Sequence, residues 1–148
     1  MSIEDLRKGK SAEYFVFSEL IKRGADVYLP AVDIGIDAIV RRKDGTYLEI
    51  QVKSTEADEQ AGCFNADDLD YYDEKRYFIV CVDLSRKPPE TWILPCGVFK
   101  EYATKPWESK EGLKSYRLDV NARDTQHGNE VRRNLLQKYL GAWELLTG

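Results

Sequence analysis

The stretch that decides the fold is Ile36-Asp-Ala-Ile-Val-Arg-Arg42, followed by Lys43-Asp-Gly-Thr46 and Tyr47-Leu-Glu-Ile-Gln-Val-Lys53. The two outer segments are rich in β-prone residues, and Asp44-Gly45 between them is a strong signal for a tight turn. The sequence therefore predicts a β-hairpin whose two strands are antiparallel neighbours.

The second strand of this hairpin has two different faces, because side chains alternate along a strand. Its apolar face consists of Leu48, Ile50 and Val52. Its polar face consists of Tyr47, Glu49, Gln51 and Lys53. We expect the apolar face to pack against a helix and the polar face to be available for chemistry.

The first strand carries one acidic residue, Asp37, directly before the apolar run Ala38-Ile-Val40. A carboxylate held near a buried sheet needs a partner, because an unpaired buried charge costs several kcal/mol or is neutralised by a shifted pKa. Either Lys53 or a metal ion would serve as that partner.

The segments before the hairpin predict a helix and a short strand. Apolar residues recur at helical spacing over residues 12–21, and Gly24 is a suitable residue to end the helix. Residues 26–30 are short and β-prone.

The segments after the hairpin alternate between polar and apolar. Residues 56–74 contain eight acidic residues and no Lys or Arg, and we expect a loop with a short helix over residues 66–72. Residues 76–83 form a nearly continuous apolar run, which is typical of a strand covered on both faces. Further strands are predicted over residues 90–94 and 115–120, with a short helix over 97–103.

The C-terminal segment predicts an amphipathic helix. Its apolar stripe consists of Val131, Leu135, Leu136, Tyr139, Leu140, Trp143 and Leu146. Packing on the domain's own sheet is the favoured interpretation, and pairing across a dimer is the alternative. The whole order predicts an α/β fold in which a mixed β-sheet is flanked by helices.

Length and composition indicate one ordinary globular domain over residues 1–148. The chain is 43% hydrophobic and 32% charged, and it has no apolar run near the roughly 20 residues that cross a bilayer. Its first residues lack an apolar signal core, so we expect a cytoplasmic protein without membrane contact. The three cysteines lack CxxC spacing, which favours reduced thiols.

The net charge of −4 argues against a protein that coats nucleic acid through bulk positive charge. The acidic excess is concentrated in residues 56–74, however, and the rest of the chain is close to neutral or slightly basic. A local basic surface therefore remains compatible with the sequence.

The polar face of the hairpin has the groups that phosphodiester cleavage requires. A hard cation such as Mg²⁺ binds oxygen ligands, and Asp37, the amide oxygen of Gln51 and, as a second-line ligand, Glu49 supply them. Lys53 shares the face of Gln51, where it can orient a water molecule and balance charge.

The stretch Gly35-Ile-Asp-Ala-Ile-Val together with Leu48-Glu-Ile-Gln-Val-Lys-Ser-Thr55 resembles the core of PD-(D/E)XK nucleases, in the variant with QxK in place of ExK. That variant is seen in some homing endonucleases and modification-dependent restriction enzymes. Upstream, Lys8-Gly-Lys-Ser-Ala-Glu13 resembles the first-helix motif of archaeal Holliday-junction resolvases.

This resemblance implies a restriction-endonuclease-like fold with an αβββαβ core, carried here by residues 1–83. It implies that the first helix brings Glu13 toward the metal, so that the predicted site consists of Glu13, Asp37, Gln51 and Lys53. The implied activity is that of a DNA endonuclease dependent on Mg²⁺ or Mn²⁺. We expect a homodimer, because one small domain offers one site and duplex cleavage needs two cuts.

Two other classes of function stay open. The first is a nuclease-fold protein that has lost cleavage and binds only nucleic acid or a protein partner. The second is an unrelated interaction module, in which Asp37 and Lys53 form a cross-strand ion pair and Glu13 is a solvated helix residue. Asp33 is interpreted as a turn residue, with a supporting role beside the metal ligands as the alternative, and His127, the only histidine, as a surface-loop residue.

Overall fold

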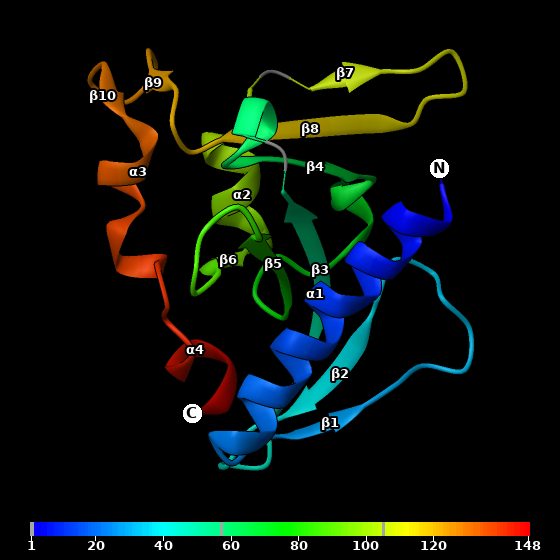
Figure 1. Ribbon diagram of the computed structural model, residues 1–148. Helices are drawn as coiled ribbons and strands as arrows, with labels where there is room; N and C mark the ends of the chain where they lie inside the picture. The colour runs from blue at the N-terminus through cyan, green and yellow to red at the C-terminus, as the bar shows by residue number, and fades with distance from the viewer. Residues whose placement is uncertain (1, 57, 105) are drawn as a thin grey trace.

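A five-stranded mixed sheet lies at the centre of the computed structural model, which describes residues 2–56, 58–104 and 106–148 (Figure 1). Its strands, in spatial order, are β1 (Asp26–Tyr28), β2 (Ala38–Arg41), β3 (Tyr47–Thr55), β5 (Tyr77–Asp83) and β6 (Glu90–Pro95). Strands β3 and β5 are parallel, and the other neighbours are antiparallel.

The predicted hairpin is confirmed as strands β2 and β3. Ala38 pairs with Ile50 and Arg41 with Tyr47, and the turn between them contains Gly45 at a φ of 88°. This positive φ is readily adopted by glycine, so Asp44-Gly45 sets the register of the hairpin. The predicted apolar residues Leu48, Ile50 and Val52 are buried, as that register requires.

Helix α1 (Ile3–Lys22) covers one face of the sheet. It begins with a capping box between Ser2 and Asp5, which satisfies backbone N–H groups at the helix start. Its buried residues include Ala12, Val16 and Leu20, which belong to the same apolar cluster as the buried face of β3. The expected packing of this face of β3 on a helix is therefore confirmed.

The opposite face of the sheet is covered by α2 (Cys96–Tyr102) and by a second sheet. This sheet consists of β4 (Cys63–Asp67), β8 (Lys114–Asp119) and β7 (Trp107–Glu108), in that order. Two short strands, β9 (Arg123–Asp124) and β10 (Glu130–Val131), pair beside it. Every residue of β5 is buried, because apolar layers cover both of its faces.

The short helix expected over residues 66–72 is confirmed only over residues 69–71. Residues 58–60 and 69–71 form the short 3-10 helices η1 (Asp58–Gln60) and η2 (Leu69–Tyr71), and β4 lies between them. In β4, Phe64 and Ala66 are buried while Asn65 and Asp67 are exposed, which is the alternation of a strand. Its partner β8 follows about fifty residues later in the chain, so the local sequence did not reveal the pairing.

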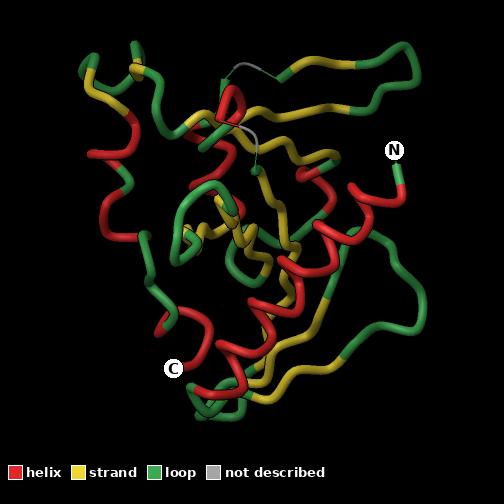
Figure 2. Tube along the Cα trace, viewed as in Figure 1, coloured by secondary structure: helices red, strands yellow, loops and turns green. Residues whose placement is uncertain are grey.

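The prediction of one continuous C-terminal helix is wrong. The segment forms α3 (Arg132–Leu135), η3 (Gln137–Tyr139) and α4 (Glu144–Thr147), separated by turns (Figure 2). Leu136 packs on the α2 face of the sheet, whereas Trp143 and Leu146 pack on the α1 face. Because the chain passes around the edge strand β6, one straight helix cannot reach both faces. The favoured interpretation, packing on the chain's own sheet, is confirmed.

Two further observations concern the cysteines and the helices. The three cysteines are free and buried, with Cys81 inside β5. Among the described residues, no helix is both long enough and apolar enough to cross a membrane.

Candidate active site

Asp37 lies directly before β2, where the β2–β3 pairing ends. Its backbone N–H donates to the carbonyl oxygen of Ile50 at 2.8 Å, and its Oδ2 accepts the N–H of Val52 at 2.7 Å. One backbone and one side-chain hydrogen bond to β3 therefore fix the half-buried Asp37 beside the strand that carries Gln51 and Lys53.

The loop between β1 and β2 brings further polar groups to the same place. Gly35 has a φ of 91°, and its N–H donates to Asp33 Oδ1 at 3.1 Å. Two stacked tyrosines hold this loop: the Tyr72 hydroxyl donates to the Ile34 carbonyl at 2.6 Å and that of Tyr77 to the Gly35 carbonyl. The loop is thus attached to the sheet on both sides of Gly35.

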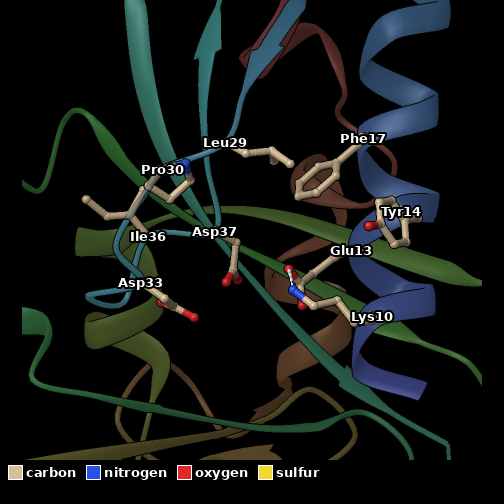
Figure 3. Close-up of a pocket in the computed structure, with 9 residues that line it drawn as sticks. All are labelled: Lys10, Glu13, Tyr14, Phe17, Leu29, Pro30, Asp33, Ile36 and Asp37. Carbon is tan, nitrogen blue, oxygen red and sulfur yellow. Dashed lines mark hydrogen bonds and ion pairs between the residues drawn. The ribbon is translucent and has the colours of Figure 1, made fainter. Parts of the chain in front are cut away.

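A small cavity of about 130 Å³ lies between this loop and the middle of α1 (Figure 3). The carboxylates of Glu13, Asp33 and Asp37 point toward a common space, and Lys10 reaches Glu13 from the preceding turn of the helix. Lys10 Nζ and Glu13 Oε1 are 3.2 Å apart. The remaining lining consists of Tyr14, Phe17, Leu29, Pro30 and Ile36.

The electrostatics of the cavity disfavour ionised carboxylates. Burial raises the pKa of Glu13, and the neighbouring charge of Asp37 raises it further, against the opposing effect of Lys10. Burial also raises the pKa of Asp37; the Val52 N–H and the charges of Lys53 and Lys10 oppose this shift, while Asp33 adds to it. A bound cation would relieve both effects, because it favours the charged forms.

The predicted site residues lie in two groups joined by Asp37. Glu13 and Asp37 line the cavity, whereas Gln51 and Lys53 project from the polar face of β3 and are not part of its lining. Lys53 is close enough to lower the pKa of Asp37. Glu49 lies opposite Ile39, one pair further along the hairpin. Burial raises the pKa of Tyr72, and the negative charge of Glu49 adds to this shift. Glu49 is absent from the described cavity lining.

The side-chain oxygen of Gln51 is the clearest sign of a missing partner. Gln51 Oε1 is buried and accepts no hydrogen bond within the described part of the chain. Buried polar atoms are normally paired, so an orphaned amide oxygen beside Asp37 fits a ligand of a hard cation. The described residues do not include three or more His, Cys, Asp or Glu side chains close enough together to hold a metal ion. The donor set that fits is therefore mixed: carboxylates and one amide.

Two residues of this site were not among the four predicted site residues. Lys10 pairs with Glu13, and Asp33, interpreted as a turn residue, both forms the turn and lines the cavity. Lys10 precedes Glu13 by three residues and so lies on nearly the same side of a helix, which is a signal that the sequence did contain. The inward direction of the Asp33 side chain depends on Gly35 and the two tyrosines, and no local sequence pattern predicts it.

Comparisons with protein-family models and with curated protein sequences give no match. Solved structures do match. A bacterial homing endonuclease, I-Ssp6803I, is similar with a TM-score of 0.60 and 21% identity, covering 93% of this chain and 88% of that one. The Holliday junction resolvase Hjc of the archaeon Archaeoglobus fulgidus has a TM-score of 0.51 and 16% identity, covering 76% of this chain and 84% of that one.

Both neighbours are nucleases of the PD-(D/E)XK type. The chain therefore has the restriction-endonuclease-like fold, a mixed sheet flanked by helices, and the predicted fold class is confirmed. Within that fold, the position expected for a helix between the third and fourth core strands is occupied by β4 and the short helices η1 and η2.

Proposed function

We propose that this protein is a divalent-metal-dependent DNA endonuclease whose site is formed by Glu13, Asp37, Gln51 and Lys53. The observation that carries the proposal is the position of Asp37. It faces the carboxylates of the cavity and is fixed by hydrogen bonds to β3, across from Gln51, whose Oε1 has no partner among the described residues. Residues 1–148 act as one nuclease-like domain in this proposal.

Oxygen atoms from three elements would hold the cation. Asp37 and Gln51 are the main ligands, Glu13 contributes from α1, and Glu49 is retained as a second-line ligand that has to turn toward the site. Mg²⁺ or Mn²⁺ bound there would stabilise the charge that develops on the phosphate and lower the pKa of a water molecule.

Lys53 has a different task from the ligands. Its ammonium group, two residues from Gln51 on the same face of β3, orients the attacking water and balances negative charge at the phosphate. Lys10 holds Glu13 in place from the preceding turn of α1.

DNA is proposed as the substrate because two nucleases share the fold at TM-scores above 0.5, one a homing endonuclease and the other a Holliday junction resolvase. A homodimer is proposed because cutting both strands of a duplex needs two sites. Sedimentation of the protein with and without a short duplex tests the dimer directly.

Incubation with supercoiled plasmid, linear duplex, single strands and a four-way junction tests the function. Each substrate is offered with Mg²⁺, with Mn²⁺ and with EDTA. The proposal expects cleavage of at least one DNA substrate in either metal and none in EDTA. Cleavage that is unchanged in EDTA contradicts the proposed role of the metal.

A second candidate function is binding to nucleic acid without cleavage. It is favoured by Gln51, an amide where a stronger carboxylate ligand would bind metal more tightly, and by the net charge of −4. The same panel separates the two candidates. Salt-sensitive binding without cleavage in either metal supports this second function, because phosphate contacts release counterions.

A further inference from the structure

Gly9 is an unexplained residue on the inner side of α1. It lies within a twenty-residue helix, where glycine is the least favourable residue after proline. Neither of the usual structural reasons for a glycine applies to Gly9. Its φ is not positive, and outside the neighbouring backbone of the helix a Cβ atom there would meet no described atom within 4 Å. The fold therefore has room for a side chain that the sequence does not supply.

The position of Gly9 on the helix indicates what the free space beside it serves. Gly9 precedes Glu13 by four residues, so both lie on the same side of the helix, about 6 Å apart along its axis. Gly9 lines a groove of about 270 Å³ between the first half of α1 and the end of β3, whereas Glu13 lines the cavity beside Asp37. The groove therefore continues the proposed active site along the helix.

The groove offers groups that suit a sugar–phosphate backbone. Ser54 and Thr55 of β3 line it opposite the helix, and Thr55 Oγ1 is buried without a hydrogen-bond partner among the described residues. Lys8 supplies a cation and is held there by Glu4 at 3.0 Å and by Glu56. The Asp5 carboxylate, which also borders the groove, already accepts hydrogen bonds from Ser2.

We propose that Gly9 is a positioning residue, the point where the backbone of the substrate strand lies directly against α1. This inference rests on the proposed nuclease function. Gly9 and Glu13 are about 6 Å apart along the helix axis, so a strand bound beside Glu13 extends past Gly9. The bare helix surface at Gly9 lets the strand approach, and the Ser54 hydroxyl, on the same side of β3 as the buried Val52, hydrogen-bonds it from the other side.

The test compares side chains at Gly9 with the same side chains at a matched control position. Gly9→Ala and Gly9→Met add bulk without lowering helix propensity. Ser18 is exposed and lies nine residues further along α1, which places it on the opposite side of the helix. Ser18→Ala and Ser18→Met are therefore the controls. Thermal unfolding, duplex binding in EDTA and cleavage in Mg²⁺ are measured for all four variants and the parent.

We expect Gly9→Ala to raise the melting temperature by roughly 2–4 °C, because alanine favours a helix. We also expect its KM for duplex to rise about tenfold, and that of Gly9→Met further, while kcat changes less than about threefold, as when binding common to the ground and transition states is lost. The Ser18 variants should keep the KM of the parent. A more stable protein with poorer substrate binding is a combination that a purely structural glycine does not produce.

The proposal for Gly9 fails if both Gly9 variants cleave with the KM of the parent. If the parent cleaves no substrate, the proposed nuclease function fails, and the binding measurement then decides the role of Gly9. Weaker duplex binding by Gly9→Met than by Ser18→Met supports the contact with the strand. Equal binding by these two variants overturns it.

Discussion

At the scale of single residues, Asp37 is placed where its negative charge is unfavourable for folding. Burial and Asp33 raise its pKa above the ordinary 3.8, and only part of this effect is offset by the Val52 N–H and by Lys53 and Lys10. A functional group held in such a position is expected to lower the folding stability of the free protein, because its charge is compensated only when a ligand binds. The free protein should therefore gain stability when this charge is removed.

The substitution Asp37→Asn tests this cost. In EDTA near pH 7 we expect the variant to be more stable by about 0.5–2 kcal/mol, because an amide keeps an oxygen for the Val52 N–H and loses the charge. The advantage should shrink as the pH falls through the raised pKa of Asp37 and disappear below 3.8, where the parent carboxyl is also neutral. Thermal unfolding between pH 3 and pH 8 measures both trends. A variant less stable than the parent at pH 7 would contradict this description of Asp37.

Lys53 should behave differently from the ligands. We expect Lys53→Ala to bind Mn²⁺ as the parent does and to cleave about 10²–10⁴-fold more slowly, because the water loses the group that orients it. Calorimetric metal titration and a cleavage assay on the same preparation check the two parts separately. Lost metal binding, or parental cleavage, would remove Lys53 from the proposed role.

At the scale of elements, the loop between β1 and β2 connects the fold to the site. Gly35 needs its positive φ, and a Cβ there would lie 2.3 Å from the Tyr72 hydroxyl oxygen. This hydroxyl is also the donor that holds the Ile34 carbonyl. Gly35 and Tyr72 therefore restrict the loop together, and the directions of Asp33 within the loop and Asp37 at its end depend on this restriction.

The substitution Gly35→Ala should destabilise the protein by about 1–3 kcal/mol, the usual cost of a strained backbone. Tyr72→Phe removes the clashing oxygen but also a hydrogen bond, so it should cost about 1 kcal/mol alone. In the double variant we expect part of the Gly35→Ala loss to be recovered, because only the φ strain remains. Chemical denaturation of the four proteins gives the coupling energy. Strictly additive losses would show that the clash with Tyr72 is unimportant.

Elements with a local signal were predicted from the sequence, and those fixed by distant partners were not. The hairpin was predicted because Asp44-Gly45 sets the turn and the alternation from Leu48 to Val52 sets the buried face. Strand β4 was missed because its alternation is short and its partner β8 is distant in sequence. In the C-terminal stripe Leu136, Trp143 and Leu146 are buried and the other four residues are partly buried. Its periodicity did not show that the chain changes faces near Gly141, whose N–H donates to the Thr91 carbonyl.

The same distinction applies to the candidate site. Asp37, Gln51 and Lys53 were identified because the hairpin itself places them, and Glu13 because of the first-helix resemblance. Asp33 was undervalued because its direction depends on contacts between the loop and two tyrosines that follow almost forty residues later. Gly9 gave no signal of its own until the space beside it was known.

At the scale of the whole molecule, the net charge of −4 limits how the protein can hold DNA. Long-range attraction is weak or absent, so binding has to come from a few local cations. Among the described residues, Lys8, Lys10 and Lys53 are placed near the groove and the cavity. Affinity should therefore depend on salt only modestly compared with proteins that make many phosphate contacts.

Three phosphate contacts predict a slope of about −2.7 for the logarithm of the binding constant against the logarithm of salt concentration. This corresponds to a loss of roughly 40-fold between 50 and 200 mM salt. Fluorescence anisotropy with a labelled duplex in EDTA measures the slope. A slope steeper than about −7 would mean a much larger basic surface than the three lysines provide.

The central claim is that Asp37 holds the metal with which the protein cleaves DNA. The most direct measurement is cleavage of supercoiled plasmid by the parent and by Asp37→Asn, in Mg²⁺, in excess Mn²⁺ and in EDTA. We predict that the parent cleaves only with metal, that Asp37→Asn is at least about 100-fold slower in Mg²⁺, and that excess Mn²⁺ restores part of its activity. If Asp37→Asn cleaves as fast as the parent in Mg²⁺, or the parent cleaves equally in EDTA, the assignment of this site is wrong.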